Sequence, residues 1–149
     1  MPIRRQEILT VLRDRLETIA IAAGYQTDAG ENVFLGELPA LGEDDPDVAL
    51  AIVVGDEVPQ YQGEQLFVRL PFELHTIAKA DLDEPWLTVE QLIADVKRAI
   101  EQPDRTLGGL VRRMIEREAV RTVPREPGST TVGAMVVYVA PYLEAWGDP

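Results

Sequence analysis

The feature that most constrains the fold is a long stretch of alternating positions at residues 66–80. One set of alternate positions is almost wholly apolar and comprises Leu66, Val68, Leu70, Phe72, Leu74 and Ala78. The other set carries the charges and comprises Phe67, Arg69, Glu73, His75 and Lys79. A period of two is that of a β-strand with one buried face. Pro71 lies on the outward set and donates no ladder hydrogen bond, which predicts an edge strand or a bulge there.

The segment at residues 2–23 can cover the apolar face of such a strand. Its apolar residues recur at three- and four-residue spacing and are Ile8, Leu12, Leu16, Ile19 and Ala23. This spacing predicts an amphipathic helix. Pro2 suits the first helical turn, and Gly24 is the type of residue that ends a helix.

A second helix is predicted between Thr88 and Pro103. Thr88 and Gln91 match a capping box, in which two side chains satisfy free backbone N–H groups at a helix start. The apolar stripe that follows comprises Val89, Leu92, Ile93, Val96 and Ile100. Proline cannot continue a helix, so we expect the helix to end before Pro103.

Three further segments predict strands. Residues 31–36 form a short one, and residues 48–54 are apolar on both faces, which indicates a strand in the middle of a sheet. Residues 131–142 are β-branched and apolar, and the turn-rich residues 124–129 before them predict a hairpin. Residues 55–63 instead predict an exposed connection.

Residues 107–123 allow two interpretations. A helix would fit the spacing of Leu107, Leu110, Val111 and Met114. Gly108 and Gly109, however, would cost that helix about 2 kcal/mol relative to alanines. An extended conformation over residues 111–123 would place on one side Val111, Ile115, Ala119 and Val123, together with Arg113, Arg117 and Arg121. We favour the extended interpretation, and a partly helical one stays open.

The order of elements is therefore helix, three strands, helix, two strands. Strands in runs with helices between them indicate an α+β fold, with a single mixed or antiparallel sheet of about five strands and two helices packed on it. A chain of 149 residues has the usual size of one domain. We expect residues 1–149 to form a single α+β domain.

The charge balance excludes several functions. The chain has 14 basic and 26 acidic residues, a net charge of −12. Strong binding to nucleic-acid phosphates or to anionic membranes needs an excess of Lys and Arg. The apolar run at residues 48–54 is far shorter than the ~20 residues of a membrane-spanning helix. The polar start of the chain does not have the pattern of a signal peptide, so we expect a soluble, cytoplasmic protein.

The inventory of catalytic side chains is poor. His75 is the only histidine and Ser129 the only serine. A Ser-His-acid arrangement would need both to converge with a carboxylate. Ser129 lies in a Pro-Gly-Ser-Thr-Thr turn and not in a nucleophile elbow, and His75 is placed on the outward face of a strand. We expect no catalytic residues, and the chain is not predicted to be an enzyme.

Metal and cofactor sites are not predicted either. Asp44, Asp45 and Asp47 form an acidic cluster, but they lack the ligand spacing and central glycine of a calcium loop. A solvated loop is the favoured interpretation. With one histidine and no cysteine, a zinc site is not expected.

Two groups of residues are candidates for a protein interface. Arg113, Arg117 and Arg121 belong to a basic concentration in which glutamates are interleaved, so a solvated mixed-charge face is the alternative. Several aromatics fall near predicted turns or the C-terminus, where aromatic side chains often mark binding surfaces. Burial of Trp86 against the second helix is the competing explanation for that residue. The candidate assembly interface comprises Tyr61, Trp86, Arg113, Arg117, Arg121 and Trp146.

Several stretches, taken in order, share the pattern of one protein family. They are the opening helix at residues 5–19, the run 24–36, the helix 92–100, the Asp-Arg-Thr-Leu-Gly-Gly-Leu run at 104–110, the strand end 138–142 and the closing Gly-Asp-Pro at 147–149. In these features the chain resembles the tail terminator (tail-completion) proteins of long-tailed bacteriophages, the class that includes the lambda U protein. The 104–110 run and the Gly-Asp-Pro end contribute most to the resemblance.

The resemblance implies a structural role in the virion tail. Such proteins form a ring, typically a hexamer, on the head-proximal end of the tail tube. The ring stops polymerisation of the tube protein and presents a joining surface to the head completion or connector protein. It implies host cytoplasm as the place of assembly, passage of DNA through the ring and no catalytic residues. We hypothesise that an acidic lumen lets DNA pass without sticking, and that residues 55–63 become ordered on assembly.

Other functions stay open. A different head–tail completion protein would have a similar size and a similar role. A bacterial adaptor domain could use an acidic surface to bind a basic partner. A small enzyme that uses carboxylates is the least favoured, because the inventory of site residues is so thin.

Overall fold

A computed structural model describes residues 3–37, 47–80 and 83–147. The elements in chain order are α1 (Arg4–Leu16), the 3-10 helices η1 (Ile21–Ala23) and η2 (Ala29–Glu31), β1 (Val33–Leu35), β2 (Val48–Val54), β3 (Val58–Gln62), β4 (Gln65–Lys79), α2 (Pro85–Glu101), β5 (Glu116–Val123) and β6 (Thr131–Glu144). The predicted α+β class is confirmed. No helix in these described ranges is long and apolar enough to cross a membrane.

A single mixed sheet organises the molecule. Its six strands run in the order β1-β2-β4-β6-β5, and β3 pairs with β4 beside β2. Only the β1–β2 pair is parallel; the other pairs are antiparallel. The sheet thus has one strand more than expected, because β3 lies in the segment 55–63 that was predicted to be an exposed connection. All five β3 side chains are exposed, so the strand leaves no apolar periodicity in the sequence.

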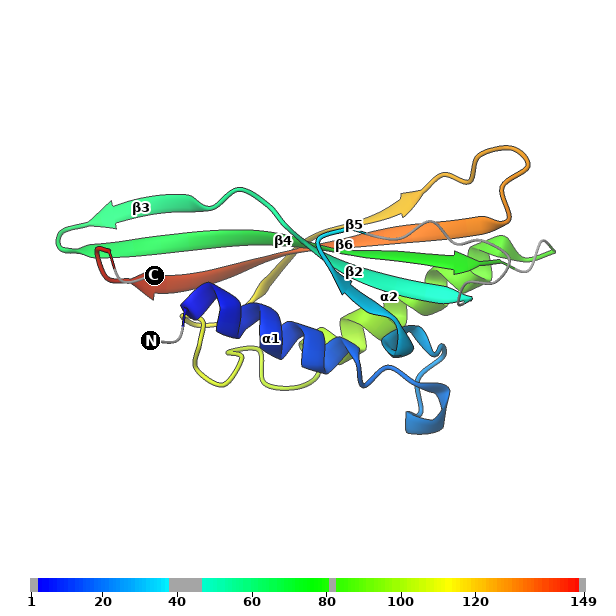
Figure 1. The fold of residues 1–149 in the computed structure, drawn as a ribbon, viewed down its shortest axis with the longest axis horizontal. Coiled ribbons are helices and arrows are strands. Elements are labelled where there is room, and N and C mark those ends of the chain that lie inside the picture. Colours follow the sequence, from blue (N-terminus) through cyan, green and yellow to red (C-terminus); the bar gives the residue numbers. More distant parts are fainter. Residues whose placement is uncertain (1–2, 38–46, 81–82, 148–149) are drawn as a thin grey trace.

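The alternation in β4 is confirmed along its whole length. Its even-numbered residues from Leu66 to Ala78 are buried, and its odd-numbered residues from Phe67 to Lys79 are half-buried. Helices α1 and α2 lie together on one side of the sheet (Figure 1). Their apolar stripes form one core with the even-numbered face of β4, to which α1 contributes Ile8, Leu12 and Leu16 and α2 contributes Leu92, Val96 and Ile100. Each such side chain stabilises the fold by ~1.5–3 kcal/mol through burial.

The expectation that Pro71 marks an edge strand or a bulge is wrong, because β4 lies at the centre of the sheet. Pro71 instead falls where β4 changes partner. Phe72 pairs with Val54 of β2, and Arg69 pairs with Val58 of β3. The Pro71 carbonyl accepts a hydrogen bond from Gly55 N at 2.8 Å. In an antiparallel ladder the nitrogen and oxygen of one residue point to the same side, so the missing donor faces the β2–β3 connection.

The first helix ends earlier than predicted. Helix α1 stops at Leu16, and Gly24 adopts a left-handed conformation at the end of η1 instead. The chain turns because Ile19 is buried in the core while Gly30 packs against the end of α1. A Cβ on Gly30 would lie 2.6 Å from the carbonyl oxygens of Leu16 and Ile19, so only glycine fits there.

The second helix begins earlier than predicted. Helix α2 starts at Pro85, with Glu84 at the N-cap and no side-chain cap hydrogen bond. The predicted capping box at Thr88 and Gln91 is therefore wrong, because the fixed backbone angle of Pro85 suits the first turn. The predicted apolar stripe is confirmed. Its members are buried against the sheet and α1 and comprise Val89, Leu92, Ile93, Val96 and Ile100.

Residues 107–123 are extended only in their second half. Residues 105–114 form a series of turns, with positive φ angles at Leu107, Gly108, Gly109 and Arg113. Strand β5 then carries a register irregularity between Arg117 and Ala119. Arg117 pairs with Tyr138 and Arg121 with Met135, and these two β6 residues point to opposite faces of the sheet. The expectation that Arg117 and Arg121 share one side is thus wrong, because the bulge reverses the alternation.

Candidate assembly interface

The structure brings two of the predicted interface residues into contact. Tyr61 lies at the end of β3, and Trp146 follows β6. Their rings stack with centroids 5.3 Å apart and an interplanar angle of 7°. Tyr61 is 65% exposed and Trp146 is 61% exposed. Two large aromatic side chains, both mostly exposed, are therefore held together at one place on the surface.

This aromatic pair lies at one end of an arm formed by β3, the first half of β4 and the end of β6 (Figure 1). Glu57, just before β3, ties the arm to the helical layer. Its Oε1 accepts a hydrogen bond from the Tyr142 hydroxyl at 3.0 Å and lies 3.3 Å from Arg5 Nη1 of α1. Burial and the bond to Glu57 raise the pKa of Tyr142. The arm is held by side chains as well as by strand pairing.

Trp86 lies apart from that pair. It is on the first turn of α2 and is 63% exposed, so burial against the helix does not account for it. Helix α2 follows the C-terminal end of β4, whereas Tyr61 and Trp146 lie beside its N-terminal end. At ~3.3 Å per residue, the 15 residues of β4 span roughly 50 Å. Trp86 and the aromatic pair thus belong to different ends of the molecule.

The three predicted arginines lie on the β5 side of the sheet but do not form one patch. Arg117 pairs with Glu101 at 3.5 Å, and Glu101 also accepts a hydrogen bond from the buried Tyr138 hydroxyl at 2.8 Å. Burial and this bond raise the pKa of Tyr138. Arg121 is exposed on the face away from the helices. Arg113 lies in the loop before β5.

Arg113 lines a hollow of about 260 Å³ on the sheet face that the helices leave uncovered. Arg69 and Arg112 line the same hollow, together with Glu116. Arg69 is paired with Glu116 at 3.2 Å and Glu118 at 3.5 Å. No ion pair joins Arg112 or Arg113 to any residue that the structure describes.

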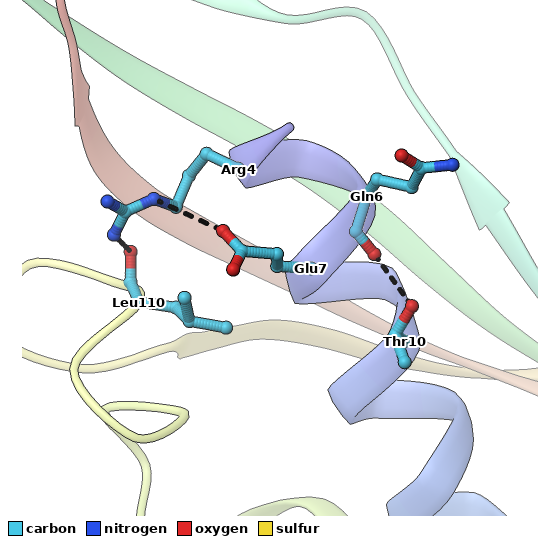
Figure 2. A network of polar contacts seen from close by, with 5 residues as sticks. All are labelled: Arg4, Gln6, Glu7, Thr10 and Leu110. Carbon is cyan, nitrogen blue, oxygen red and sulfur yellow. Dashed lines mark hydrogen bonds and ion pairs between the residues drawn. The ribbon is translucent and has the colours of Figure 1, made fainter. Parts of the chain in front are cut away.

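The loop that presents Arg112 and Arg113 is fixed by side chains of α1. Figure 2 shows Arg4 donating to the Leu110 carbonyl at 3.2 Å while its Nε lies 3.9 Å from Glu7. Thr10 and Gln6 form a second contact within the helix, at 2.9 Å. Further along α1, Arg15 donates to the Ile100 carbonyl at 3.2 Å. Ile100 lies in the last turn of α2, where the negative end of the helix dipole also stabilises the positive charge of Arg15.

The same loop is stabilised from within by Asp104. Its carboxylate accepts hydrogen bonds from Thr106 N at 2.9 Å, from the Thr106 hydroxyl and from Gly108 N at 3.0 Å. The hydrogen bonds from Thr106 and Gly108 lower the pKa of Asp104. The backbone N of Arg112 donates to the Pro141 carbonyl of β6 at 2.7 Å. Hydrogen bonds therefore hold the turns of residues 105–114 in a defined conformation.

The basic concentration noted in the sequence around Arg113, Arg117 and Arg121 belongs to a longer basic segment. Residues 97–125 hold eight of the 14 basic residues but only four of the 26 acidic ones. In the fold they form the end of α2, the turns of 105–114 and β5. The β5 side of the protein is therefore basic, although the chain as a whole is strongly acidic. Counting charge by segment, and not residue by residue, is the signal that reveals it.

His75 and Ser129 line the same hollow of about 390 Å³, but no hydrogen bond joins them. His75 Nε2 lies 2.8 Å from Glu73 Oε2, whereas the Ser129 hydroxyl lies 3.1 Å from the Thr131 hydroxyl. Thr131 pairs with Lys79, four residues from His75, a separation of roughly 13 Å along the strand. The arrangement does not connect the serine to the histidine.

The predicted acidic cluster falls largely outside the described residues, which exclude Asp44 and Asp45. Asp47 is described; its side chain is 89% exposed, and its carboxylate lies 3.7 Å from Lys79 Nζ. No group of three or more His, Asp or Glu side chains that could hold a metal occurs within residues 3–37, 47–80 and 83–147.

Asp95 of α2 is a polar residue that sequence reasoning passed over. It is 2% exposed, and its carboxylate accepts hydrogen bonds from Gln26 N at 2.9 Å and from Thr27 N at 2.8 Å. The Thr27 hydroxyl donates a third, at 2.7 Å. Asp95 thereby holds the segment between η1 and η2 against α2, which is a structural role.

The chain matches no protein-family model, and a search of curated proteins finds no significant similarity.

Proposed function

We propose that this protein is a structural tail terminator, which forms a ring on the head-proximal end of a phage or prophage tail tube. The observation that supports this most is the stacked and exposed pair of Tyr61 and Trp146 on an arm held in place by strand pairing. Tyrosine and tryptophan dominate the energetics of protein interfaces. An arm that is already ordered loses little conformational entropy on docking.

In this proposal the chain acts as a non-catalytic component of the virion tail, assembled in the host cytoplasm. The ring, expected to contain six subunits, stops growth of the tail tube and offers a surface to the head completion or connector protein. The aromatic pair is the surface that docks on one of these two partners. The structure describes β3 as paired with β4, so the earlier expectation that residues 55–63 order only on assembly is replaced by docking of an ordered arm.

DNA crosses the ring only in transit. A subset of the exposed acidic residues outside the 97–125 segment would line the passage, where they repel phosphates. Replacing lumen acids with lysine is expected to slow DNA delivery, because each lysine adds a phosphate contact. Unchanged delivery would contradict this part of the proposal.

The test is a tube-polymerisation assay with the tail-tube protein of the same genome. The wild-type protein is expected to shorten the tubes and to be seen at one end of each tube in electron micrographs. A Tyr61→Ser/Trp146→Ser variant is expected to keep its fold and to lose end binding by tenfold or more. Trp86→Ser is the matched control, since Trp86 has the same exposure on another part of the surface.

If the wild-type protein neither shortens tubes nor binds their ends, the terminator proposal is wrong. A protein that instead stays monomeric and binds a basic protein would be the adaptor that the sequence left open.

A further inference from the structure

We propose that neighbouring subunits of the ring join edge to edge, with the β5 edge of one copy against the β1 edge of the next copy. This inference deepens the proposed function by naming the contact between subunits, and it rests on that function. The occupant of each edge is therefore a second copy of this chain.

The sheet order places the two edges on opposite sides of the molecule. In the order β1-β2-β4-β6-β5, strands β1 and β5 are outermost, and each pairs with one neighbour only. Among residues 3–37, 47–80 and 83–147 no further strand pairs with either outer edge, so their outer backbone N–H and C=O groups can pair with another chain. A contact between two different edges is heterologous, so it continues from copy to copy and closes when the rotation divides a full turn.

The β5 edge is apolar and basic in its second half, beyond Ala119, whereas Glu116 and Glu118 in its first half are paired with Arg69. Val120 is 39% exposed and Val123 is 49% exposed. Arg121 lies between them, and Arg125 follows the strand; both are exposed. Neither arginine has an ion-pair partner among the residues that the structure describes. The end of β5 thus offers two apolar side chains close to Arg121 and Arg125, two cations that form no ion pair within the described part of the chain.

The β1 edge is apolar and acidic. Phe34 is 39% exposed and Leu35 is 53% exposed. Glu31 and Glu37 flank the strand, and both are exposed. Within the described part of the chain neither glutamate has an ion-pair partner. The two edges therefore match in apolar content and are opposite in charge.

The charges also select against the alternative pairings. Two β5 edges would bring Arg121 and Arg125 of both copies together, and two β1 edges would do the same with Glu31 and Glu37. Like charges set against each other disfavour both symmetric dimers. Only the β5–β1 contact places opposite charges together. It therefore favours head-to-tail association, which can close into a ring, over a symmetric dimer.

A charge swap tests the contact. Arg121→Glu/Arg125→Glu and Glu31→Arg/Glu37→Arg are each expected to weaken self-association by at least tenfold. Mixing the two variants, or combining all four changes in one chain, is expected to restore it, because the charges are again opposite. The control Asp14→Arg/Glu90→Arg changes the net charge as Glu31→Arg/Glu37→Arg does, but on exposed helix positions, and should assemble as wild type does. The proposed contact would be overturned if both charge-reversal variants fold and associate as wild type does. It would also be overturned if the chain with all four substitutions stays monomeric.

Cross-linking keeps the failure of this contact distinct from failure of the ring. The chain has no cysteine, so Leu35→Cys and Val120→Cys chains with different tags can be mixed and treated with a short bismaleimide. We expect the 35–120 heterodimer to exceed both homodimers, whereas a Trp86→Cys chain mixed with Val120→Cys should give none. If wild type forms rings but no 35–120 product appears, the edge contact is wrong and the ring stands. If neither rings nor products form, both proposals fail.

Discussion

The centre and the edges of this sheet differ in what they contribute, since the centre provides stability and the edges provide surfaces for association. At the centre, β4 and β6 pair over 14 positions and carry the residues on which both helices pack. At the edges, β1 and β5 each have one partner strand and expose apolar side chains, with glutamates flanking β1 and arginines at the end of β5. The centre therefore determines whether the chain folds, and the edges are available for association. A substitution at the centre should change stability, and one at an edge should change assembly alone.

The largest effect is expected from Phe72→Ala at the centre. Phe72 is fully buried and stacks on Tyr138 with ring centroids 5.4 Å apart. Truncating a buried phenylalanine leaves a cavity and lowers the free energy of unfolding by about 3–5 kcal/mol. Urea denaturation followed by circular dichroism measures the change. A loss below about 1 kcal/mol would show that the centre is not packed as described.

Asp95→Ala should destabilise somewhat less. The change removes the acceptor of three hydrogen bonds and leaves the N–H groups of Gln26 and Thr27 partly buried without a partner. We expect a loss of about 3 kcal/mol in the free energy of unfolding. Hydrogen exchange at Thr27 should also speed up, since its amide would be released. Glu90→Ala, on the exposed side of the same helix, should cause neither change.

Tyr138 gives the centre a dependence on alkaline pH. Burial and the bond to Glu101 raise its pKa in the folded protein, whereas in the unfolded chain its pKa is ~10. The contribution of Tyr138 to the free energy of unfolding is therefore complete below pH ~10. It is lost as the pH rises above ~10, because in that range the tyrosine releases its proton in the unfolded chain but keeps it in the folded protein. Between pH 10 and 11, wild type should lose about 1 kcal/mol more stability than Tyr138→Phe. Equal losses in the two proteins would contradict this assignment.

The smallest effect on stability is expected at an edge. Val120→Ser on β5 removes a partly exposed side chain, so the free energy of unfolding should change by only about 0.5 kcal/mol. Self-association should nevertheless weaken severalfold, because the valine lies in the proposed contact. Thermal melting and sedimentation of the same sample separate the two effects. A large loss of stability without a change in association would reverse the roles assigned to centre and edge.

The same division explains what could be predicted from the sequence. The β4 strand and both apolar helix stripes were predictable, because burial on one face imposes a period on the residues. Strand β3 was missed because its five side chains are all exposed and only its backbone pairs. The positions of Arg117 and Arg121 were wrong because a bulge, which has no sequence period, reverses the faces of β5.

The candidate site was less predictable than the fold. The sequence marked Tyr61 and Trp146 as exposed aromatics, but it could not show that strands remote in the chain bring the two rings together. Arg121 and Arg125 at the end of β5, and the two glutamates around β1, gain meaning only from the sheet order. Sequence spacing carries no information about which strands are outermost.

The most direct test of the central claim, assembly through oppositely charged edges, is the mass of the wild-type protein in solution, measured by light scattering across protein and salt concentration. We expect a hexameric species of six times 16.5 kDa. Its fraction should increase with protein concentration and decrease as salt screens the charges at the contact. A constant mass of 16.5 kDa at every concentration and ionic strength would contradict the claim.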